Sequence, residues 1–496
     1  MFDPLALTLK LLRSRGRIDW TRVATRWLPF ADVATPELPL AQLLRLALFQ
    51  LSVGMVAVLT VGTLNRVMIV ELGVGAWLVS LMVALPILFA PFRALVGFRS
   101  DEHKSPLGWR RVPYVWFGSG AQFAGLAIMP FALVLFEGTT AVQLFAAHAA
   151  AALAFLLAGA GAQVVQTAGL ALATDRATEA TRPRVVALMY VMLLLGMAGS
   201  GALFGWLLAD YTPTRLVQVV QGVAVAALLL NAVAVWKQEA RDPERGAWAR
   251  RRAEAASVRF TDRWAAFSAN RRVARFLLAV GLGTAAFNMQ DIILEPYGGE
   301  VLGLSVGQTT WLTGLMALGA LVAFALAGRQ LMRGASAERL AAHGLLVGLV
   351  AFSMVVFAEP LGSPGLFRAG VLLIGFGGGL FSVGTLSAAM AMAPAGQAGM
   401  VLGAWGGVVA TAAGLSIALG GALRDLVGHA AMSGALGEAL AMPATGYAFV
   451  YHLELALLFL TLAVIGPLVT RRRASIAAAP DADVPHGRFG LADFPG

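Results

Sequence analysis

The residues of this chain that could do chemistry are a few polar side chains set inside long apolar stretches. His148, Gln163 and Gln166 share one stretch, and His452 lies in another. A neutral imidazole nitrogen is a good axial ligand for the magnesium of a chlorin ring, and an amide oxygen can serve similarly. A histidine in a helix is more commonly a hydrogen-bonded packing residue, and both interpretations stay open.

A second polar group combines Asn288, Asp291 and Glu295 in one apolar stretch. Asp291 and Glu295 are four residues apart, so a continuous helix would place them on one face. Ionisable groups inside a membrane are costly and mark either contacts between helices or functional sites. The spacing therefore predicts an interhelical polar contact or, as the alternative, a site for a cation or proton.

Trp405 lies well inside an apolar stretch, whereas the other tryptophans of the apolar region lie near predicted helix ends. It is either a packing residue or a flat wall for an aromatic or macrocyclic ligand. Glycines four residues apart predict close packing of helices. They are Gly201 with Gly205, Gly375 with Gly379, and Gly399 with Gly403 and Gly407.

One loop carries a recognisable order of residues: Gly97, Asp101, Gly108, Arg110 and Arg111. This order resembles the signature loop of major facilitator transporters, although four more residues separate Asp101 from Gly108 than in the usual pattern. The glycine permits a tight exit from a helix, and the aspartate can cap a helix or pair with arginine. The loop indicates the fold more than it indicates gating.

These residues must be positioned by membrane helices. About 20 mainly apolar residues are needed to cross the hydrocarbon of a bilayer. Twelve stretches qualify, near 43–64, 75–96, 112–136, 143–172, 185–208, 215–236, 273–294, 308–328, 340–358, 367–392, 398–423 and 447–470. The sequence thus predicts an all-α membrane protein with 12 transmembrane helices.

The distribution of basic residues predicts the orientation. With a cytoplasmic N-terminus, 32 of the 37 Lys and Arg residues fall on the cytoplasmic side. The positive-inside rule then places both termini in the cytoplasm of a bacterial inner membrane, multi-pass. The net charge of +10 lies in loops beside helices, where it favours anionic lipid headgroups, and no nucleic-acid partner is expected.

Composition excludes other classes of protein. Hydrophobic residues make up 58% of the chain and charged residues 13%, which excludes an ordinary soluble globule. The absence of cysteine excludes disulfides, thiolate metal sites and thiol catalysis. No nucleophile–base pair or phosphate-binding glycine loop stands at a workable spacing, so the chain is not expected to be an enzyme.

The chain divides into two similar parts. We expect a partly amphipathic arm at 1–40, a six-helix bundle at 41–236, a basic cytoplasmic linker at 237–272, a second six-helix bundle at 273–470 and a disordered tail at 471–496. Six helices on each side of a basic linker is the layout of major facilitator transporters.

Several longer stretches together resemble one branch of that superfamily. They include LLRLALFQ at 43–50, GTLNRVMIVELG at 62–73, LPILFAPFRA at 85–94, GWRRVPY at 108–114, QTAGLALATDRA at 166–177 and RPRVVA at 182–187. The chain is similar to the PucC/LhaA-type bacteriochlorophyll-delivery family, which supports assembly of light-harvesting antennae in purple phototrophic bacteria. The resemblance covers nearly all of the membrane region and is densest in its first half.

The resemblance implies an assembly factor for purple-bacterial antenna complexes. Such a protein binds bacteriochlorophyll, with carotenoid as a second candidate pigment. It delivers the pigment to antenna α and β polypeptides around or beside the reaction centre core, in the photosynthetic membrane. The candidate pigment ligands (His148, Gln163, Gln166, Trp405 and His452) come from the chain's own chemistry. The alternative hypothesis is a proton-coupled secondary transporter of a small amphipathic solute, using Asp291 or Glu295.

Overall fold

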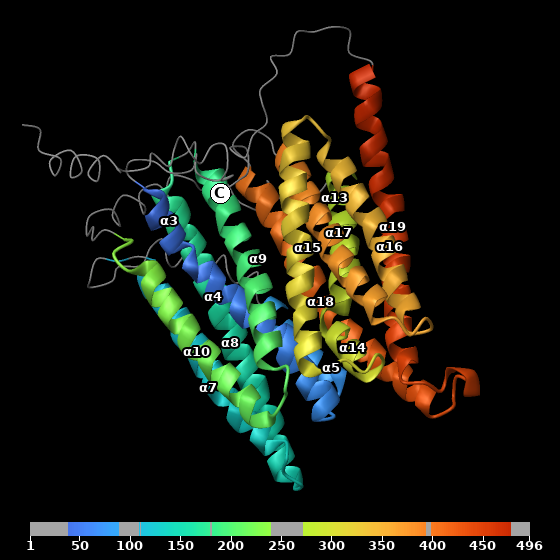
Figure 1. Ribbon diagram of the computed structural model, residues 1–496. Helices are drawn as coiled ribbons and strands as arrows, with labels where there is room; N and C mark the ends of the chain where they lie inside the picture. Colours follow the sequence, from blue (N-terminus) through green and yellow to red (C-terminus); the bar gives the residue numbers. More distant parts are fainter. Residues whose placement is uncertain are drawn as a thin grey trace, which may run out of the picture.

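The computed structural model describes residues 38–88, 109, 111–178, 181–239, 271–392 and 398–477. Within these ranges the chain is almost entirely helical, and the helices run roughly side by side in a bundle (Figure 1). Most of the predicted arm and most of the predicted linker lie outside these ranges.

The first half begins with α3 (Leu40–Leu46) and α4 (Leu48–Ala57), which continue through two π-helical segments, Val58–Leu64 and Val67–Glu71. The remaining helices of this half are α5 (Ala76–Leu88), α7 (Val112–Leu135), α8 (Ala141–Arg176), α9 (Arg182–Leu207) and α10 (Pro213–Val235).

The second half begins with α13 (Arg271–Asn288), a 3-10 segment (Met289–Ile292) and α14 (Leu294–Glu300). It continues with α15 (Val306–Met332), α16 (Ala337–Ala358), α17 (Pro364–Ala391), α18 (Ala398–Met432), a short 3-10 turn (Glu438–Leu440) and α19 (Ala444–Ala477).

The observed helices match the predicted spans closely. In the described ranges, eleven helical stretches are long and apolar enough to cross a membrane, and the shorter apolar helix α5 ends where the described residues stop before 89–108. Several stretches exceed the predictions: the first reaches Glu71 and the eleventh predicted span, α18, reaches Met432. Helix α19 continues to Ala477, so the first residues of the predicted tail are helical.

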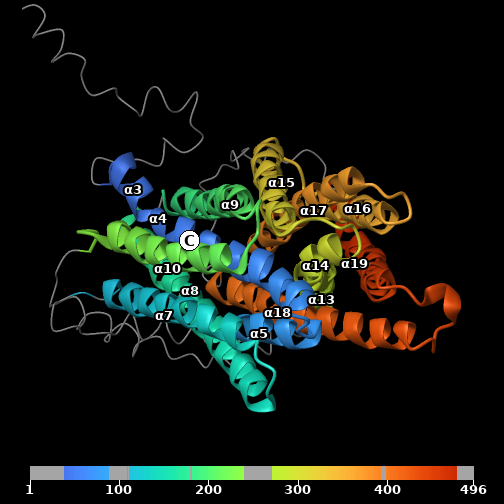
Figure 2. The ribbon, with the colours of Figure 1, turned by 60° about the horizontal axis from the view of Figure 1, so that its bottom comes forward.

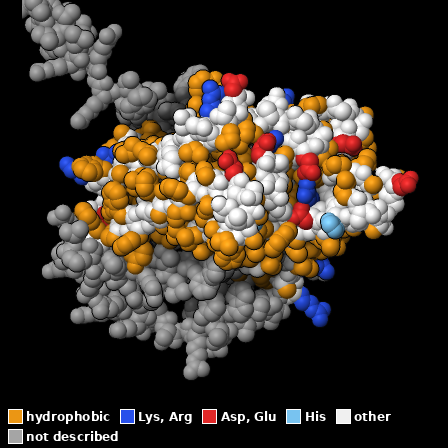
Figure 3. Space-filling model, turned by 90° about the horizontal axis from the view of Figure 1, so that it is seen from below, with side chains coloured by type: hydrophobic (Ala, Val, Ile, Leu, Met, Phe, Trp, Pro, Cys, Tyr) orange, Lys and Arg blue, Asp and Glu red, His pale blue; other side chains and the backbone are white. Residues whose placement is uncertain are grey.

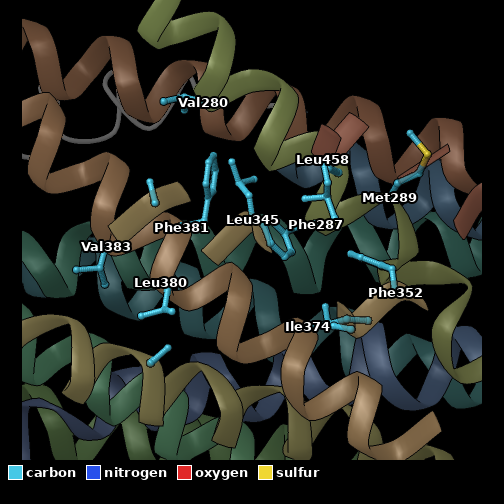
Figure 4. Packing of buried hydrophobic residues seen from close by; sticks show 14 of the residues in the cluster. Val280, Phe287, Met289, Leu345, Phe352, Ile374, Leu380, Phe381, Val383 and Leu458 are labelled. Carbon is cyan, nitrogen blue, oxygen red and sulfur yellow. The ribbon is translucent and has the colours of Figure 1, made fainter. Parts of the chain in front are cut away.

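The second half has a buried core of its own, built from residues between Val273 and Leu468. Phe287 of α13 lies at its centre, with its ring centroid 5.8 Å from that of Phe381 and 6.2 Å from that of Phe352 (Figure 4). Tilted aromatic contacts of this kind add to the gain from burial. This core fixes α13, and with it the polar residues that follow Asn288.

The two halves meet mainly along two pairs of helices, α9 with α15 and α5 with α18 (Figures 1 and 2). A Cβ atom added at Gly201 would lie 2.6 Å from the Cα atom of Gly314, and Gly205 lies against Trp311. These glycines are near the end of α9 that carries few basic loop residues, the predicted periplasmic end. The halves are therefore joined closely there.

Close packing was the prediction for glycines at four-residue spacing, and Gly201, Gly205, Gly375 and Gly379 confirm it. Gly201 and Gly205 let α9 approach α15. The prediction was wrong for Gly403 and Gly407 of α18, where an added Cβ would meet no atom within 4 Å. Four-residue spacing marks a small-residue face, but it does not say whether another helix covers that face.

Candidate functional site

The two candidate histidines have the same local geometry. His148 Nδ1 lies 2.6 Å from the carbonyl oxygen of Leu144, and His452 Nδ1 lies 2.7 Å from the carbonyl oxygen of Ala448. A carbonyl can only accept, so each Nδ1 carries the hydrogen and donates. In the neutral imidazole Nε2 is then the nitrogen with the free lone pair, which is the tautomer that a metal ligand needs.

Both histidines lie among apolar side chains on the outer surface of the bundle. The ring of Phe136 meets that of His148 edge-on, with centroids 5.0 Å apart. Phe145, three residues before His148, is 75% exposed, and Phe449, three residues before His452, is 45% exposed. A large apolar ligand could therefore approach either Nε2 from the lipid side.

The five predicted pigment residues do not gather in one pocket. Gln163 and Gln166 follow His148 on α8 by 15 and 18 residues, which separates them by about 22 and 27 Å along the axis. Helices α8 and α19 lie on opposite sides of the bundle in both ribbon views (Figures 1 and 2). His148 and His452 are therefore separate candidate ligands.

Two of the predicted ligands carry buried polar atoms without a partner. Gln163 Oε1 and Trp405 Nε1 are both buried, and neither makes a hydrogen bond to the described residues. Trp405 packs against the core of the second half, while Gly403, Gly406 and Gly407 near it on α18 border open space. Packing thus accounts for the Trp405 ring but not for its N–H group.

The predicted polar group of the seventh span is split by a break in the helix. Helix α13 ends at Asn288, whose side chain donates to the Thr284 carbonyl at 2.7 Å. Asp291 belongs to the 3-10 segment and accepts from Gln290 Nε2 at 2.6 Å, whereas Glu295 belongs to α14. The two carboxyl groups therefore lie on different helical segments, not on one continuous helix.

Glu295 makes contacts between the two halves. Its Oε1 accepts from Thr313 Oγ1 at 2.6 Å, and its Oε2 accepts from Asn65 Nδ2 at 3.4 Å. Asn65 belongs to the first helix and also donates to the Ile292 carbonyl at 3.3 Å. The interhelical polar contact is thus the interpretation that the geometry of Glu295 supports.

The same part of the first helix adds two further polar contacts. Thr63 Oγ1 lies 3.2 Å from Thr310 Oγ1 of α15. Arg66 is 4% exposed, pairs with Glu71 and donates to the carbonyl of Leu304 at 3.4 Å. These bonds, with those of Glu295, form a polar seam between the halves toward the predicted periplasmic end.

A buried polar network in the first half was not singled out from the sequence. Ser52 Oγ donates to Asn231 Oδ1 at 2.6 Å, and Asn231 Nδ2 donates to Gln122 Oε1 at 3.1 Å, joining α4, α10 and α7. Gln50 is fully buried nearby in the chain, and neither polar atom of its amide has a partner among the described residues. The sequence does show isolated polar residues within apolar spans, which could have indicated such a network. It does not show which helices pack together, so the hydrogen-bond partners could not be predicted.

Of the predicted signature loop, only Arg111 lies among the described residues; Gly97, Asp101, Gly108 and Arg110 lie outside them. The backbone N–H of Arg111 donates to Glu239 at 3.0 Å, and its Nε donates to Asp175 at 3.1 Å. Arg111 therefore ties the start of α7 to the ends of α8 and α10.

Charged residues also link helices at the predicted periplasmic end, where they form small groups on the surface (Figure 3). Arg424 of α18 pairs with Glu300 and with Asp425, and its guanidinium lies 4.5 Å from the ring centroid of Tyr447. Asp425 also accepts from the backbone N–H of Trp77 at 2.8 Å. A groove of about 850 Å³ is lined by these residues except Tyr447.

Solved structures with the same architecture are membrane transporters. The chain is similar to a bacterial homologue of the human lysosomal transporter Spinster in an inward-facing, unoccupied conformation, with a TM-score of 0.64 and 14% identity over 89% of this chain and 98% of that one. It is also similar to the nucleoside transporter NupG, with a TM-score of 0.63 and 13% identity over 85% and 99% of the two chains. At such identities the likeness shows the fold alone.

Relatives in sequence are much closer. An uncharacterised protein of the puhA–bchM intergenic region of Rhodobacter capsulatus is 54% identical over 95% of this chain and 98% of its own. The PucC protein of Rhodovulum sulfidophilum is 52% identical over 82% and 90%. A protein named bacteriochlorophyll synthase 44.5 kDa chain, from Rhodobacter capsulatus, is 30% identical over 88% and 96%. The PUCC protein family model matches residues 63–473, and the chain belongs to that family.

Proposed function

We propose that this protein binds bacteriochlorophyll at the lipid-facing surface of its bundle and delivers it to the antenna α and β polypeptides, around or beside the reaction centre. Family membership and the names of the relatives support a photosynthesis-related role. The specific step of pigment delivery is the proposal. Carotenoid is a second candidate pigment for the same apolar surface.

The observation that carries the proposal is the contact between His148 Nδ1 and the Leu144 carbonyl at 2.6 Å. The Nδ1–H is held by the Leu144 carbonyl, so the Nε2 lone pair is available in an apolar setting beside Phe136. A magnesium chlorin needs one neutral axial nitrogen and an apolar surface for its ring and tail. His452 repeats the arrangement on α19 and is the second candidate ligand.

The test is to purify the full chain in mild detergent from cells that make bacteriochlorophyll and to measure pigment per protein. We expect H148A to lower the ratio of pigment to protein and the double variant H148A/H452A to lower it further. His343, an exposed histidine of α16, supplies the control, and H343A should leave the ratio unchanged. Pigment-free native protein that also fails to co-purify with antenna polypeptides would overturn the proposal.

A further inference from the structure

The break after α13 gathers oxygen atoms that the proposed pigment function does not use. The 3-10 segment Met289–Ile292 interrupts the span Arg271–Glu300. Interrupted membrane helices expose backbone groups and commonly border sites for small cations or protons. The core around Phe287 holds this break in place from one side.

Glu454 of α19 lies beside this break. Its side chain is fully buried, and neither carboxyl oxygen has a hydrogen-bond partner of normal geometry in the described part of the chain. It lies close to the backbone of Gln290 and within electrostatic range of the Asp291 carboxyl.

Two further unpartnered oxygens lie in the same region. Gln290 is fully buried and donates its amide nitrogen to Asp291, but its Oε1 has no partner within the described ranges. Tyr451 is fully buried one turn before Glu454, lies within electrostatic range of it, and its hydroxyl is also unpartnered there. Buried oxygens from α19 and the 3-10 segment thus lie in one region, and the hydroxyl of Tyr451, which could donate, makes no hydrogen bond to any of them.

No basic side chain among the described residues neutralises this group. Arg66 pairs with Glu71, and Arg424 pairs with Glu300 and Asp425. His452 is on the outer surface. The titratable groups near the break are Asp291, Glu295, Tyr297, Tyr447, Tyr451 and Glu454. On the neighbouring helices α15 to α18 the charged or titratable residues lie toward the helix ends: Arg329, Glu338, Arg339, His343, Arg368, Arg424, Asp425 and His429.

We propose that Glu454, Asp291 and Gln290 form a proton-binding site in the second half of the bundle. A buried carboxylate without a cation is strongly unfavourable, and one bound proton removes the charge and converts an acceptor into a donor. The added O–H of Glu454 then supplies a hydrogen bond to an oxygen of Gln290 or Asp291. In the described ranges, no group of three or more His, Cys, Asp or Glu side chains has the arrangement of a metal site.

Infrared spectroscopy of the purified full chain tests this site without any pigment. We expect the native protein at neutral pH to show the C=O band of a protonated carboxyl group and E454Q to show it more weakly, so that the native-minus-E454Q difference spectrum contains the band. Glu338 supplies the control, because it is a buried carboxyl that faces Arg272 at 4.0 Å; E338Q should keep the band. D291N should keep the band but shift its position, because the neighbour of the carboxyl group has changed.

Three results would overturn the proposal. The first is a native protein without the band, and the second is a native-minus-E454Q difference spectrum that does not contain it. The third is loss of the native band on adding sodium at constant pH, which would assign the oxygens to a metal cation. If E454Q does not fold, the D291N variant decides, since an unchanged band position would place the protonated carboxyl elsewhere. All of these results are independent of whether the protein binds bacteriochlorophyll.

Discussion

Glu295 shows how one buried side chain links two halves of a membrane protein. Its oxygens accept from Thr313 in the second half and from Asn65 in the first. A buried acceptor that loses its donor costs about 1–3 kcal/mol, more than the bond itself contributes. The stability of the polar seam should therefore depend on the two uncharged donors to Glu295, the Thr313 hydroxyl and the Asn65 amide.

Replacing Thr313 tests this dependence. We expect T313V, which keeps the shape but removes the donor to Glu295, to lower the free energy of unfolding by about 1–3 kcal/mol. Thermal unfolding in detergent measures the loss. The control is T309V on the same helix, because Thr309 is equally buried but bonds only to carbonyls of the first turn of α15 and its N-cap. Equal losses in the two variants would contradict the role of Glu295.

The sequence revealed these residues individually but not as partners. Asp291 and Glu295 were identified by their charge inside an apolar span, yet the spacing predicted one shared face, and the break after Asn288 separates them. Gln50 and Gln122 gave only the weak signal of a polar residue between apolar ones. Partners that come from helices over a hundred positions apart, such as Gln122 and Asn231, require the packing of the helices.

At the scale of elements, the helices themselves could be predicted because hydrocarbon thickness sets their length. Apolar runs located the spans to within a few residues at most ends. Composition could not predict which face of each helix packs against another helix. Gly201 on α9 is covered by α15, whereas Gly199, two residues earlier, meets no atom within 4 Å.

This contrast within one helix gives a second test. We expect G201A to destabilise the protein by about 1–3 kcal/mol, because the new methyl group must displace the backbone at Gly314. G199A adds the same methyl group on the open face and should cost nothing, since alanine favours a helix by about 1 kcal/mol over glycine. Unfolding measured in parallel for the two variants checks the difference, and a tolerated G201A would show that α9 and α15 can separate freely.

At the scale of the whole molecule, the halves also meet through a helix cap. Asp425 of α18 accepts from the backbone N–H of Trp77 at the start of α5, so a residue of the second half satisfies the N-terminus of a helix in the first. Such caps contribute about 0.5–2 kcal/mol. Loss of the Asp425 cap should weaken the contact between the two halves at the predicted periplasmic end without unfolding either half.

The absence of cysteine allows a direct measurement of this contact. A single reporter, T310C, lies at a buried position of the polar seam. We expect D425A to raise its rate of labelling by a membrane-impermeant thiol reagent about fivefold, which corresponds to about 1 kcal/mol. D210A is the control, because the exposed Asp210 pairs with Arg215 within the first half. Equal labelling rates in T310C, T310C/D425A and T310C/D210A would mean that the Asp425 cap does not hold the halves together.

The length of α8 has a consequence for the lipid around the protein. Its 36 residues extend for about 54 Å, against about 30 Å of hydrocarbon in a typical bilayer, and with α7 it reaches beyond the neighbouring helices at the lower end of Figure 1. The exposed side chains of Val142 and Phe145 make the surface of that projecting end apolar. Hydrophobic mismatch of this kind is relieved when the leaflet thickens or the helices tilt. Either response distorts the lipid beside α7 and α8, which is where His148 lies.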